Sequence, residues 1–477
     1  MTDGLEISEV RLSEIIENKD GRIDSQFWTA TITENSRYVY KKIGDILKQS
    51  QYGISIEMNE DGNGYPIYRM NEIHNSVCDL EVKKYANITP QEFEIFKLNY
   101  GDVLFNRTNS YEWVGRTGIY YKASEHDDKV FASYLVRLIP DTEYILPEYL
   151  TAFLNTEIAK HQIKARARQS VNQTNVNPEE VKEIAIPLLC KELQIAIQKN
   201  YHSAYADLIA AKKAYSQAES ILNEYLHIRD YDDNGYAVKT LSDSFMQSGR
   251  LDAEYYQPKY EQYEKTVIHG KYGYALIKNK FACITDKCER NLSRHAYIEI
   301  GDINVDSGSY TYTVLNTEDL PDNAKIMTRA GDILVSTVRP NRGAVAILEE
   351  DNLLVSGAFT VLRPKSDYSK ELLQVLLRTP VYRDWLLKFN VGTSYPVIKD
   401  NDILNMPIPL LERDKQKEIS DKVQESFRLR KEAKWLLDNA IKAVETAIET
   451  DEETALRLLT IENKKYELFN YIAFKQL

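Results

Sequence analysis

Two short polar segments in each half of the chain carry residue types that hydrogen-bond to nucleic-acid bases. They are residues 107–110 and 166–175 in the first half, and residues 337–342 and 390–399 in the second. Arginine pairs with guanine, asparagine and glutamine pair with adenine, and hydroxyl groups bond to either base. Polar loops also commonly just cross a protein surface. The residue types alone therefore leave both a solvated loop and a DNA-reading loop open.

The candidate DNA-binding residues are polar side chains of these four segments. They are Arg107, Thr108, Asn109, Ser110, Arg166, Arg168, Gln169, Ser170, Asn172, Gln173, Thr337, Arg339, Asn341, Arg342, Thr393, Ser394, Tyr395 and Lys399. No catalytic or metal-binding residue is predicted. Cys283 and Cys288 are close in sequence, but no second pair and no nearby group of histidines completes four ligands, so structural thiols are favoured.

Mixed β and α structure is expected to hold the polar segments in each half. Short apolar strands are predicted at 103–105 and 333–335, just before the polar tips, with returning strands at 115–121 and 343–348. Third strands are predicted at 134–139 and 359–362. One short helix is then predicted in each half, at 147–159 and at 370–389.

A long helix is predicted to follow the globular region of each half. In residues 190–228, apolar and small residues recur in alternating steps of four and three, which is a heptad seam, and no Pro or Gly interrupts them. A second uninterrupted run covers residues 413–449. At ~1.5 Å per residue, either helix is a rod of roughly 55 Å, and the buried stripe of one predicts the other as its partner.

Three sequence matches in the same order indicate a tandem duplication. The segment Arg22–Trp28 matches Arg250–Tyr256, Gly101–Phe105 matches Gly331–Val335, and the Ile-Pro-Leu-Leu at 186–189 returns at 408–411. The offsets are 222 to 230 residues. An internal repeat dictates architecture, so each half is a globular region followed by a long helix. With two such polar loops, one from each half, held at the ends of a rod, the DNA-reading interpretation becomes the favoured one.

Length, charge and composition narrow the class of protein. At 477 residues the chain is too long for one core. The net charge of −12 argues against a surface coated with phosphate-binding groups, although 160–168 forms a local basic window. No run of eighteen apolar residues occurs and the N-terminus has no apolar signal core, so we expect a cytoplasmic protein without membrane association.

Two other classes of function are alternatives to DNA recognition, an enzyme and a protein scaffold. A methyltransferase acting on an exocyclic amine needs an Asn/Asp-Pro-Pro-Tyr/Phe loop, and an ATPase needs a phosphate-binding loop; neither motif is present. Asp102 and Asp332 could suggest nuclease carboxylates, but a turn-forming aspartate before a strand explains both. A coiled-coil scaffold with two protein-binding modules remains the alternative, and it fits the negative charge.

The ordered motifs resemble the specificity (S) subunit of type I restriction-modification systems. They are Arg-Leu-Asp-Ala-Glu-Tyr-Tyr at 250–256, Gly-Asp-Ile-Leu-Val-Ser-Thr at 331–337, Gly-Thr-Ser-Tyr-Pro at 392–396 and the repeated Ile-Pro-Leu-Leu with its long helix. The resemblance extends to about Glu449. It implies an α/β (α+β) fold with two target-recognition domains, separated by two long helices that form an antiparallel coiled coil.

The resemblance also implies a division of labour. This non-catalytic chain would read a bipartite site in double-stranded DNA, while methyltransferase (M) subunits and restriction (R) subunits dock with it. S-adenosylmethionine, ATP and Mg²⁺ would be bound by those partners, and no cofactor by this chain. The expected domains are 1–188 and 229–411 for target recognition, 189–228 and 412–450 for the spacer helices, and 451–477 for a helical tail.

Two features depart from the family pattern. The first copy carries Arg-Gln-Ser-Val-Asn-Gln-Thr at 168–174 in place of a Gly- and Thr/Ser-rich loop. Residues from about Asp451 to Leu477 form an acidic break and a last helical segment, to which the family pattern assigns no role. We expect this tail to pack back on the coiled coil, with a docking arm for a partner as the alternative.

Overall fold

The computed structural model describes residues 9–17, 23–29, 35–124, 127–170, 173–226, 236–285 and 292–460. The chain divides into two compact units, Met1–Ile209 with Arg430–Leu477, and Ala210–Leu429. The division falls inside both long helices, α7 (Lys191–Leu226) and α14 (Arg413–Glu449). Each unit therefore holds one globular module and one end of each long helix.

The module of the first unit is built on a six-stranded sheet in the order β2-β12-β8-β10-β6-β5, beside a four-stranded sheet in the order β11-β4-β7-β3. Its strands are β1 (Tyr40–Lys42), β2 (Leu47–Tyr52), β3 (Met58–Asn59), β4 (Tyr65–Tyr68), β5 (Ile73–His74), β6 (Val77–Cys78), β7 (Tyr85–Ala86), β8 (Val103–Asn106), β9 (Thr108–Asn109), β10 (Thr117–Ile119), β11 (Val130–Phe131), β12 (Leu135–Pro140), β13 (Arg168–Gln169), β14 (Thr174–Asn175) and β15 (Ala185–Pro187). Its shorter helices are α1 (Leu12–Glu17), α2 (Ser25–Thr29), α3 (Pro90–Phe96), α4 (Pro147–Leu154), α5 (Glu157–Arg166) and α6 (Pro178–Lys182).

The module of the second unit repeats the central strand order. Its sheet β17-β24-β21-β22 corresponds to β2-β12-β8-β10, and a second sheet has the order β19-β18-β23-β20. Its strands are β16 (Tyr274–Leu276), β17 (Phe281–Ile284), β18 (Arg294–Ile298), β19 (Thr313–Asn316), β20 (Ala324–Met327), β21 (Ile333–Ser336), β22 (Val345–Ile347), β23 (Leu354–Ser356), β24 (Phe359–Pro364) and β25 (Pro407–Pro409). Its helices are α8 (Phe245–Ser248), α9 (Pro258–Ile268), α10 (Ile277–Lys280), α11 (Lys370–Arg378), α12 (Pro380–Leu386) and α13 (Asp400–Leu404), with 3₁₀ turns η2 (Ala253–Tyr256), η5 (Pro340–Arg342) and η6 (Leu387–Phe389).

The repeated Gly-Asp turn leads into the central strand of each sheet. Gly101 and Gly331 have φ values of 87° and 90°, which residues with a Cβ rarely adopt. Asp332 accepts a hydrogen bond from the backbone N of Arg329 at 2.9 Å and a bidentate pair from Arg363 at 2.7 Å each. Asp102 likewise pairs with an arginine of the neighbouring strand, Arg137, at 3.1 Å. The prediction that these aspartates form turns is confirmed, and each buried aspartate also pairs with an arginine, Arg137 being buried and Arg363 partly buried.

The prediction of one short helix after the third strand was wrong in both halves, because two helices stand there. In the first unit the break comes at Thr156, whose hydroxyl accepts a hydrogen bond from the backbone N of Ala159 at 3.1 Å. In the second unit Thr379 caps α12, and Pro380 occupies its first turn. A threonine cap and a proline both favour starting a new helix over extending the previous one.

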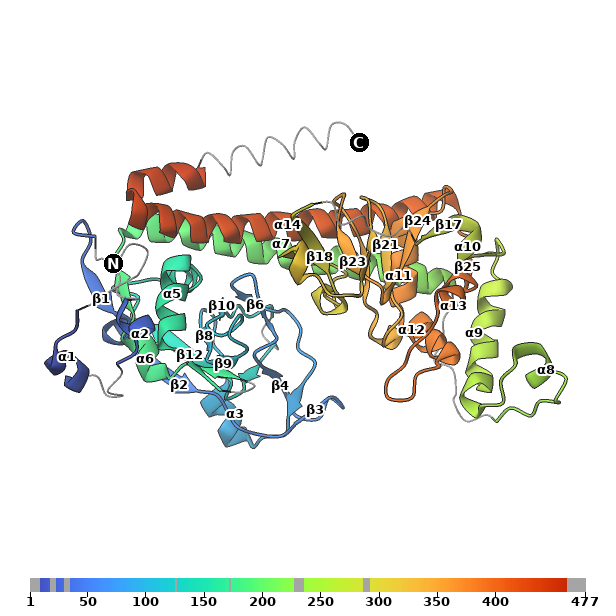
Figure 1. Cartoon of the computed structure of the whole chain (residues 1–477), viewed down its shortest axis with the longest axis horizontal. Coiled ribbons are helices and arrows are strands. Elements are labelled where there is room, and N and C mark those ends of the chain that lie inside the picture. The colour runs from blue at the N-terminus through green and yellow to red at the C-terminus, as the bar shows by residue number, and fades with distance from the viewer. Residues whose placement is uncertain are drawn as a thin grey trace. The chain divides into compact units, whose positions relative to one another are not determined.

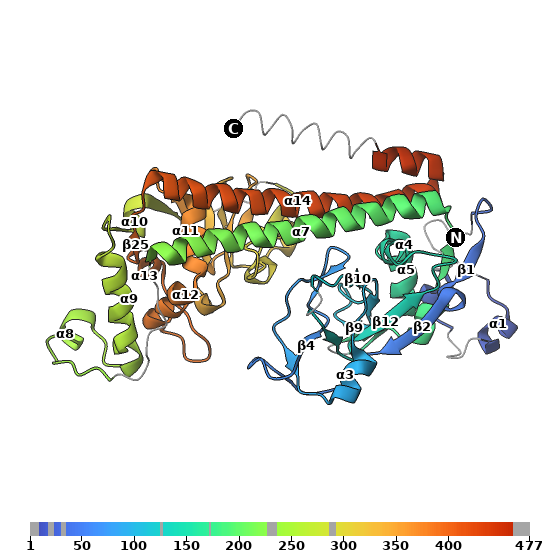
Figure 2. The ribbon, with the colours of Figure 1, turned by 180° about the vertical axis from the view of Figure 1, so that it is seen from behind.

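The predicted seams of both long helices are buried. On α7, Leu193, Ile197, Tyr201 and Ala204 are fully buried in the first unit, and Ala218 and Leu222 in the second. On α14, Ile419 and Val423 are buried in the second unit, and Leu437, Ala440 and Val444 in the first. Since the start of α7 packs with the end of α14, and the reverse, the two helices are antiparallel (Figures 1 and 2).

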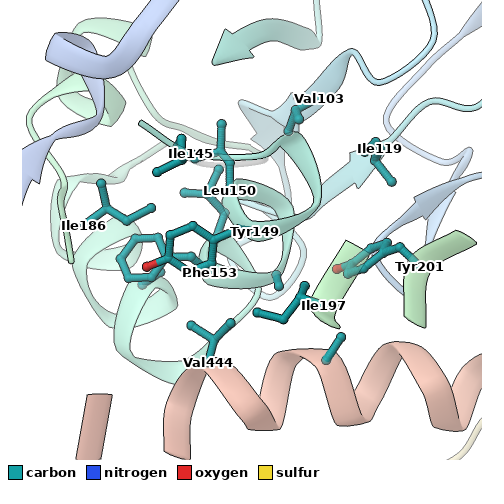
Figure 3. Packing of buried hydrophobic residues seen from close by; sticks show 14 of the residues in the cluster. Val103, Ile119, Ile145, Tyr149, Leu150, Phe153, Ile186, Ile197, Tyr201 and Val444 are labelled. Carbon is teal, nitrogen blue, oxygen red and sulfur yellow. The ribbon is translucent and has the colours of Figure 1, made fainter. Parts of the chain in front are cut away.

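Within the first unit the helix pair and the module share one core. Figure 3 shows Ile197 and Tyr201 of α7 and Val444 of α14 in the same cluster as Tyr149 and Phe153 of α4. The hydroxyl of Tyr201 donates to Ser76 Oγ at 3.0 Å. The module is therefore attached to the helices by its hydrophobic core.

The Ile-Pro-Leu-Leu repeat forms the join between each module and its helix. Its first residues lie in β15 and β25, which pair antiparallel with β1 and β16. A glutamine in the first turn of each helix then closes the join. Gln194 Nε2 donates to Leu189 O at 2.8 Å, and Gln416 Nε2 donates to Leu411 O at 3.0 Å.

The start of the C-terminal tail packs back on the first unit. Residues 452–460 are helical, with Ala455 and Leu459 in the core of that unit. Glu452 Oε1 accepts a hydrogen bond from the backbone N of Cys190 at 2.6 Å, just before α7 begins. Residues 452–460 thus pack on the core that both long helices share, and residues 461–477 of the expected tail lie outside the described residues.

No helix within the described ranges is both long and apolar enough to cross a membrane.

Removing the carboxylate of Asp332 should weaken the second unit, because the Arg363 guanidinium loses its ion-pair partner. For Asp332→Ala we expect the opening free energy of β21 and β24, measured by amide hydrogen exchange, to fall by about 3 kcal/mol. Asp367→Ala is the control, because its ion pair with Arg413 is exposed and should contribute under about 1 kcal/mol. Equal effects of the two substitutions would contradict a structural role for the buried pair.

Candidate nucleic-acid interface

The two polar segments of the first half lie side by side in the structure. Thr108 and Asn109 form β9, which pairs antiparallel with β14, and β14 pairs in turn with β13. The register places Asn175 opposite both Thr108 and Arg168. The backbone N of Ser170 donates to Gln173 O at 2.8 Å, which closes the β13–β14 hairpin. A three-stranded sheet thus unites segments that are some sixty residues apart.

The two polar segments of the second half meet in the same way. Val338 and Val397 form an antiparallel bridge, and the backbone N of Arg339 donates to Pro396 O at 2.7 Å. The loop that contains Tyr395 is closed by a bond from Val391 N to Val397 O at 2.8 Å. Gly392 lies so close to Tyr395 O that a Cβ there would stand 2.1 Å from it, so this loop needs glycine.

One residue makes the same two backbone hydrogen bonds in both modules. Arg107 N donates to Tyr134 O at 3.0 Å, and Arg107 O accepts from Val176 N at 2.9 Å. Its counterpart Thr337 donates to Ala358 O at 2.9 Å and accepts from Ile398 N at 3.0 Å. The two modules therefore share one arrangement of backbone hydrogen bonds around the two polar segments, which we call the frame. Each module presents different side chains on its own copy of the frame.

Near the start of the second polar segment of each module, a cationic side chain lies over an aromatic ring of the motif that is repeated at residues 22–28 and 250–256. Arg166 lies 5.5 Å from the ring centroid of Phe27, and Lys388 lies 5.0 Å from that of Tyr255. Burial lowers the pKa of Lys388. Arg250 of the same motif donates to Asn390 O at 2.9 Å. The repeated motif thus supports the base of the second polar loop.

The predicted residues separate into exposed and enclosed groups. The exposed side chains are Ser110, Arg168, Gln169, Ser170, Gln173, Arg339, Arg342, Thr393, Ser394, Tyr395 and Lys399. Thr108 and Thr337 are buried, and Arg107, Asn109, Arg166 and Asn341 are partly buried. Asn172 lies outside the described residues. The exposed group presents hydrogen-bonding atoms to solvent.

The enclosed residues bond within the protein. Thr108 Oγ1 donates to Asn175 Oδ1 at 2.6 Å, and Thr337 Oγ1 donates to Ala358 O at 2.8 Å. Arg166 Nε lies 3.8 Å from Glu180 Oε2. The backbone carbonyl of Asn341 accepts a bond from Arg383 Nε at 2.6 Å. These interactions hold the frame in place.

Two exposed aromatic residues beside the first tip are not among the site residues predicted from the sequence. Tyr111 and Trp113 are 38% and 42% exposed, which is high for such large rings. The guanidinium of Arg116 lies 3.4 Å from the ring centroid of Trp113, and Lys164 Nζ lies 5.2 Å from that of Tyr111. Aromatic residues interleaved with the polar tip, Tyr-Glu-Trp after Ser110, were the signal available in the sequence.

Among the residues that the structure describes, no cluster of three or more His, Cys, Asp or Glu side chains could hold a metal ion. Cys288 lies outside the described residues. The geometry of the two frames supports binding through hydrogen bonds and charge.

Comparison with known proteins gives relatives of one kind. Over 160 residues the chain is 32% identical to the provisionally named MjaX type I restriction enzyme specificity subunit of Methanocaldococcus jannaschii, and over 181 residues it is 28% identical to the EcoKI specificity subunit of Escherichia coli. These matches cover 33% and 37% of this chain, and 37% and 39% of the relatives. No family model matches the chain. The resemblance to type I specificity subunits is confirmed over about a third of the chain.

Solved structures of the same kind cover more of the chain at low similarity. The HsdS subunit of Thermoanaerobacter tengcongensis covers 88% of this chain and 98% of its own, at 13% identity and a TM-score of 0.29. The S subunit of M. genitalium covers 90% and 98%, at 12% identity and a TM-score of 0.37. TM-scores this low do not establish a shared fold, so the fold of this chain is described from its own structure.

The hydroxyl of Thr108 should stabilise the first frame, since it is buried and bonded to Asn175. For Thr108→Val we expect the opening free energy of β9 and β14, measured by hydrogen exchange, to fall by about 1 kcal/mol. Ser110→Ala removes an exposed hydroxyl from the same tip and should leave that free energy within about 0.5 kcal/mol. The reverse order of effects would show that Thr108 does not hold the frame.

Proposed function

We propose that this chain is a specificity subunit of a type I restriction-modification enzyme, which reads a bipartite site in double-stranded DNA. One observation carries the proposal. In each unit, two polar segments far apart in sequence meet on the same backbone frame, and they present different exposed side chains there. A shared frame with variable side chains suits two modules that do the same task on different sequences.

The exposed side chains are proposed to contact base edges and phosphates. In the first module Arg168, Gln169 and Gln173 lie on or beside the β13–β14 hairpin, which forms one edge of the three-stranded sheet; the major groove admits a β-ribbon of this width. In the second module the exposed set is Arg339, Arg342, Tyr395 and Lys399 with Thr393 and Ser394. Because the two sets differ, the two half-sites should differ in sequence. The enclosed residues, such as Thr108 and Arg166, are proposed to position the readers.

The paired helices are proposed to act as the spacer between the half-sites. Binding of one module would make the second contact intramolecular, which raises the overall affinity without any new contact. The proposed domains follow the repeat: recognition domains at 1–188 and 229–411, spacer helices at 189–228 and 412–450, and a tail at 451–477.

The chemistry is proposed to reside in partner subunits. The chain would bring methyltransferase subunits, and restriction subunits docked with them, to the target site. S-adenosylmethionine, ATP and Mg²⁺ would be bound by those partners. The relatives' names describe them as specificity subunits of restriction enzymes, which supports this division.

Selection of bound duplexes from a random pool tests the proposal, with the chain in complex with a methyltransferase subunit. We expect two short conserved blocks separated by a fixed number of indifferent base pairs, with affinity that falls as salt rises. Recovery of no motif by an assembled complex would contradict DNA recognition. That result would favour the alternative of a coiled-coil protein scaffold, which the net charge of −12 suits.

Lengthening both helices should lengthen the gap between the blocks. One heptad inserted between Ile209 and Ala210, and another between Leu429 and Arg430, would keep both seams in register. Seven residues add ~10 Å, so we expect the selected gap to grow by about three base pairs, with both blocks unchanged. An unchanged gap in the folded variant would mean that the helices do not set it.

A further inference from the structure

Arg339 adopts a backbone conformation that long side chains rarely take. Its φ and ψ are 50° and 52°, in the left-handed region, which costs an L-residue about 1–2 kcal/mol. In the described part of the chain the other non-glycine residues with positive φ are Asn75, Ser76 and Asn352, all with short polar side chains. Strain of this kind concentrates at functional sites.

The surrounding backbone holds Arg339 in this conformation. Its N–H donates to Pro396 O at 2.7 Å, and its carbonyl accepts a bond from Arg342 N at 2.9 Å. Pro340 follows directly, and a proline disfavours the right-handed helical conformation for the residue before it. The two polar segments of the second module therefore fix the direction in which the Arg339 side chain leaves the backbone.

The guanidinium of Arg339 lies over an aromatic ring of the neighbouring loop. Its central carbon is 5.4 Å from the ring centroid of Tyr395, and both residues are exposed. Tyr395 stands on a loop in which Asn390 Oδ1 accepts bonds from Gly392 N at 2.8 Å and Val397 N at 2.9 Å. A cation at this distance is attracted to the ring face, which favours one position of the guanidinium, and its N–H groups are not engaged by that attraction.

Two other arginines near this frame, Arg383 and Arg250, are engaged inside the protein, whereas Arg342 is exposed like Arg339. Arg383 Nε donates to Asn341 O at 2.6 Å, and burial lowers the pKa of that guanidinium. Arg250 bonds to Asp252 and to Asn390 O. Of the ion pairs found between described residues, none joins Arg339 to a carboxylate. Arg339 is thus an oriented cation that can bond to a ligand.

We propose that Arg339, braced on Tyr395, reads a guanine in the second half-site. The inference rests on the proposed function and adds the base that one residue recognises. The fork of N–H groups on a guanidinium matches guanine O6 and N7, which lie side by side in the major groove. Lysine offers a point charge in place of the planar fork, so it should discriminate guanine less strongly.

The first module carries other residues at the equivalent positions, so this reader belongs to one half-site. By the repeat offsets Asn109 stands where Arg339 does, and Gln173 stands where Tyr395 does. Asn109 Oδ1 accepts a hydrogen bond from Ser110 N at 2.8 Å, which turns it toward its own backbone. The guanine should accordingly occur in the block read by the second module.

The experiment uses the complex of the full chain with its methyltransferase subunit, and selection from a random pool for wild type and variants. Arg339→Ala should lose the preference for guanine at one position of one block by roughly 10- to 100-fold, and leave the other block unchanged. Arg339→Lys should lose most of the same preference while keeping the charge. Tyr395→Leu should weaken it, because the guanidinium loses its brace.

A matched control is available at the opposite end of the same strand. Arg329 is exposed and precedes the turn into β21, whereas Arg339 lies in the polar tip that follows β21. Arg329→Ala should keep the guanine preference. As a test on the wild-type protein, 7-deazaguanine at the selected position removes the N7 acceptor, so it should weaken wild-type binding and leave the binding of Arg339→Ala unchanged.

Other results would overturn the inference. One such result is a wild-type motif that contains no guanine in the block read by the second module. A second contradicting result would be an Arg339→Ala complex that keeps its preference for guanine while its affinity falls equally for all sequences. In that case the salt dependence of binding should decrease by about one phosphate contact, which would mean that Arg339 contacts a phosphate. If the wild-type complex recovers no motif at all, the proposed function itself fails, which is a separate outcome.

Discussion

The structure depends on the burial of the heptad seams of α7 and α14. An isolated helix of this length would expose a continuous apolar stripe to water, and most of the stability of a helix in a protein comes from packing such a face. In the first unit Leu193, Ile197 and Tyr201 pack with Leu437 and Val444, and the same cluster includes α4 of the module. In the second unit Ile419 and Val423 pack with Leu222 of α7. Each module is therefore ordered together with its end of the helix pair.

Specific polar contacts fix the arrangement that hydrophobic burial alone would leave loose. Asn200 Nδ2 donates to Leu436 O at 3.2 Å across the helix pair of the first unit, and a buried polar group at a seam favours one register. Glu148 and Glu371, at the start of α4 and α11, are both buried. Each accepts a bond from a long helix, from Gln198 Nε2 at 3.1 Å and from Gln424 Nε2 at 2.9 Å. A hydrogen bond from a glutamine of a long helix to a buried glutamate thus joins the module to the helix in both copies.

The two copies share the frame of backbone hydrogen bonds and differ in their exposed side chains. The Asp–Arg pairs behind β8 and β21, and the shared hydrogen bonds of Arg107 and Thr337, are backbone-directing features that persist in both copies. The exposed side chains differ throughout, with Gln173 in one copy at the position of Tyr395 in the other. Under the proposed function, in which base recognition depends on side-chain donors and acceptors at fixed positions, such a frame would allow one module to change its target without refolding.

The sequence by itself determined the duplication, the mixed α and β modules, both long helices and the turn role of Asp102 and Asp332. These follow from heptad spacing, apolar runs and turn residues, which are local properties. It could not place Thr108 against Asn175, or Arg339 over Tyr395, because those contacts join segments that only strand pairing brings together. It also could not separate exposed Arg168 from partly buried Arg166, two residues away, because α5 ends between them and β13 begins. Tertiary structure decided which polar residues support the frame and which face the solvent, because that choice depends on the backbone hydrogen bonds between distant segments.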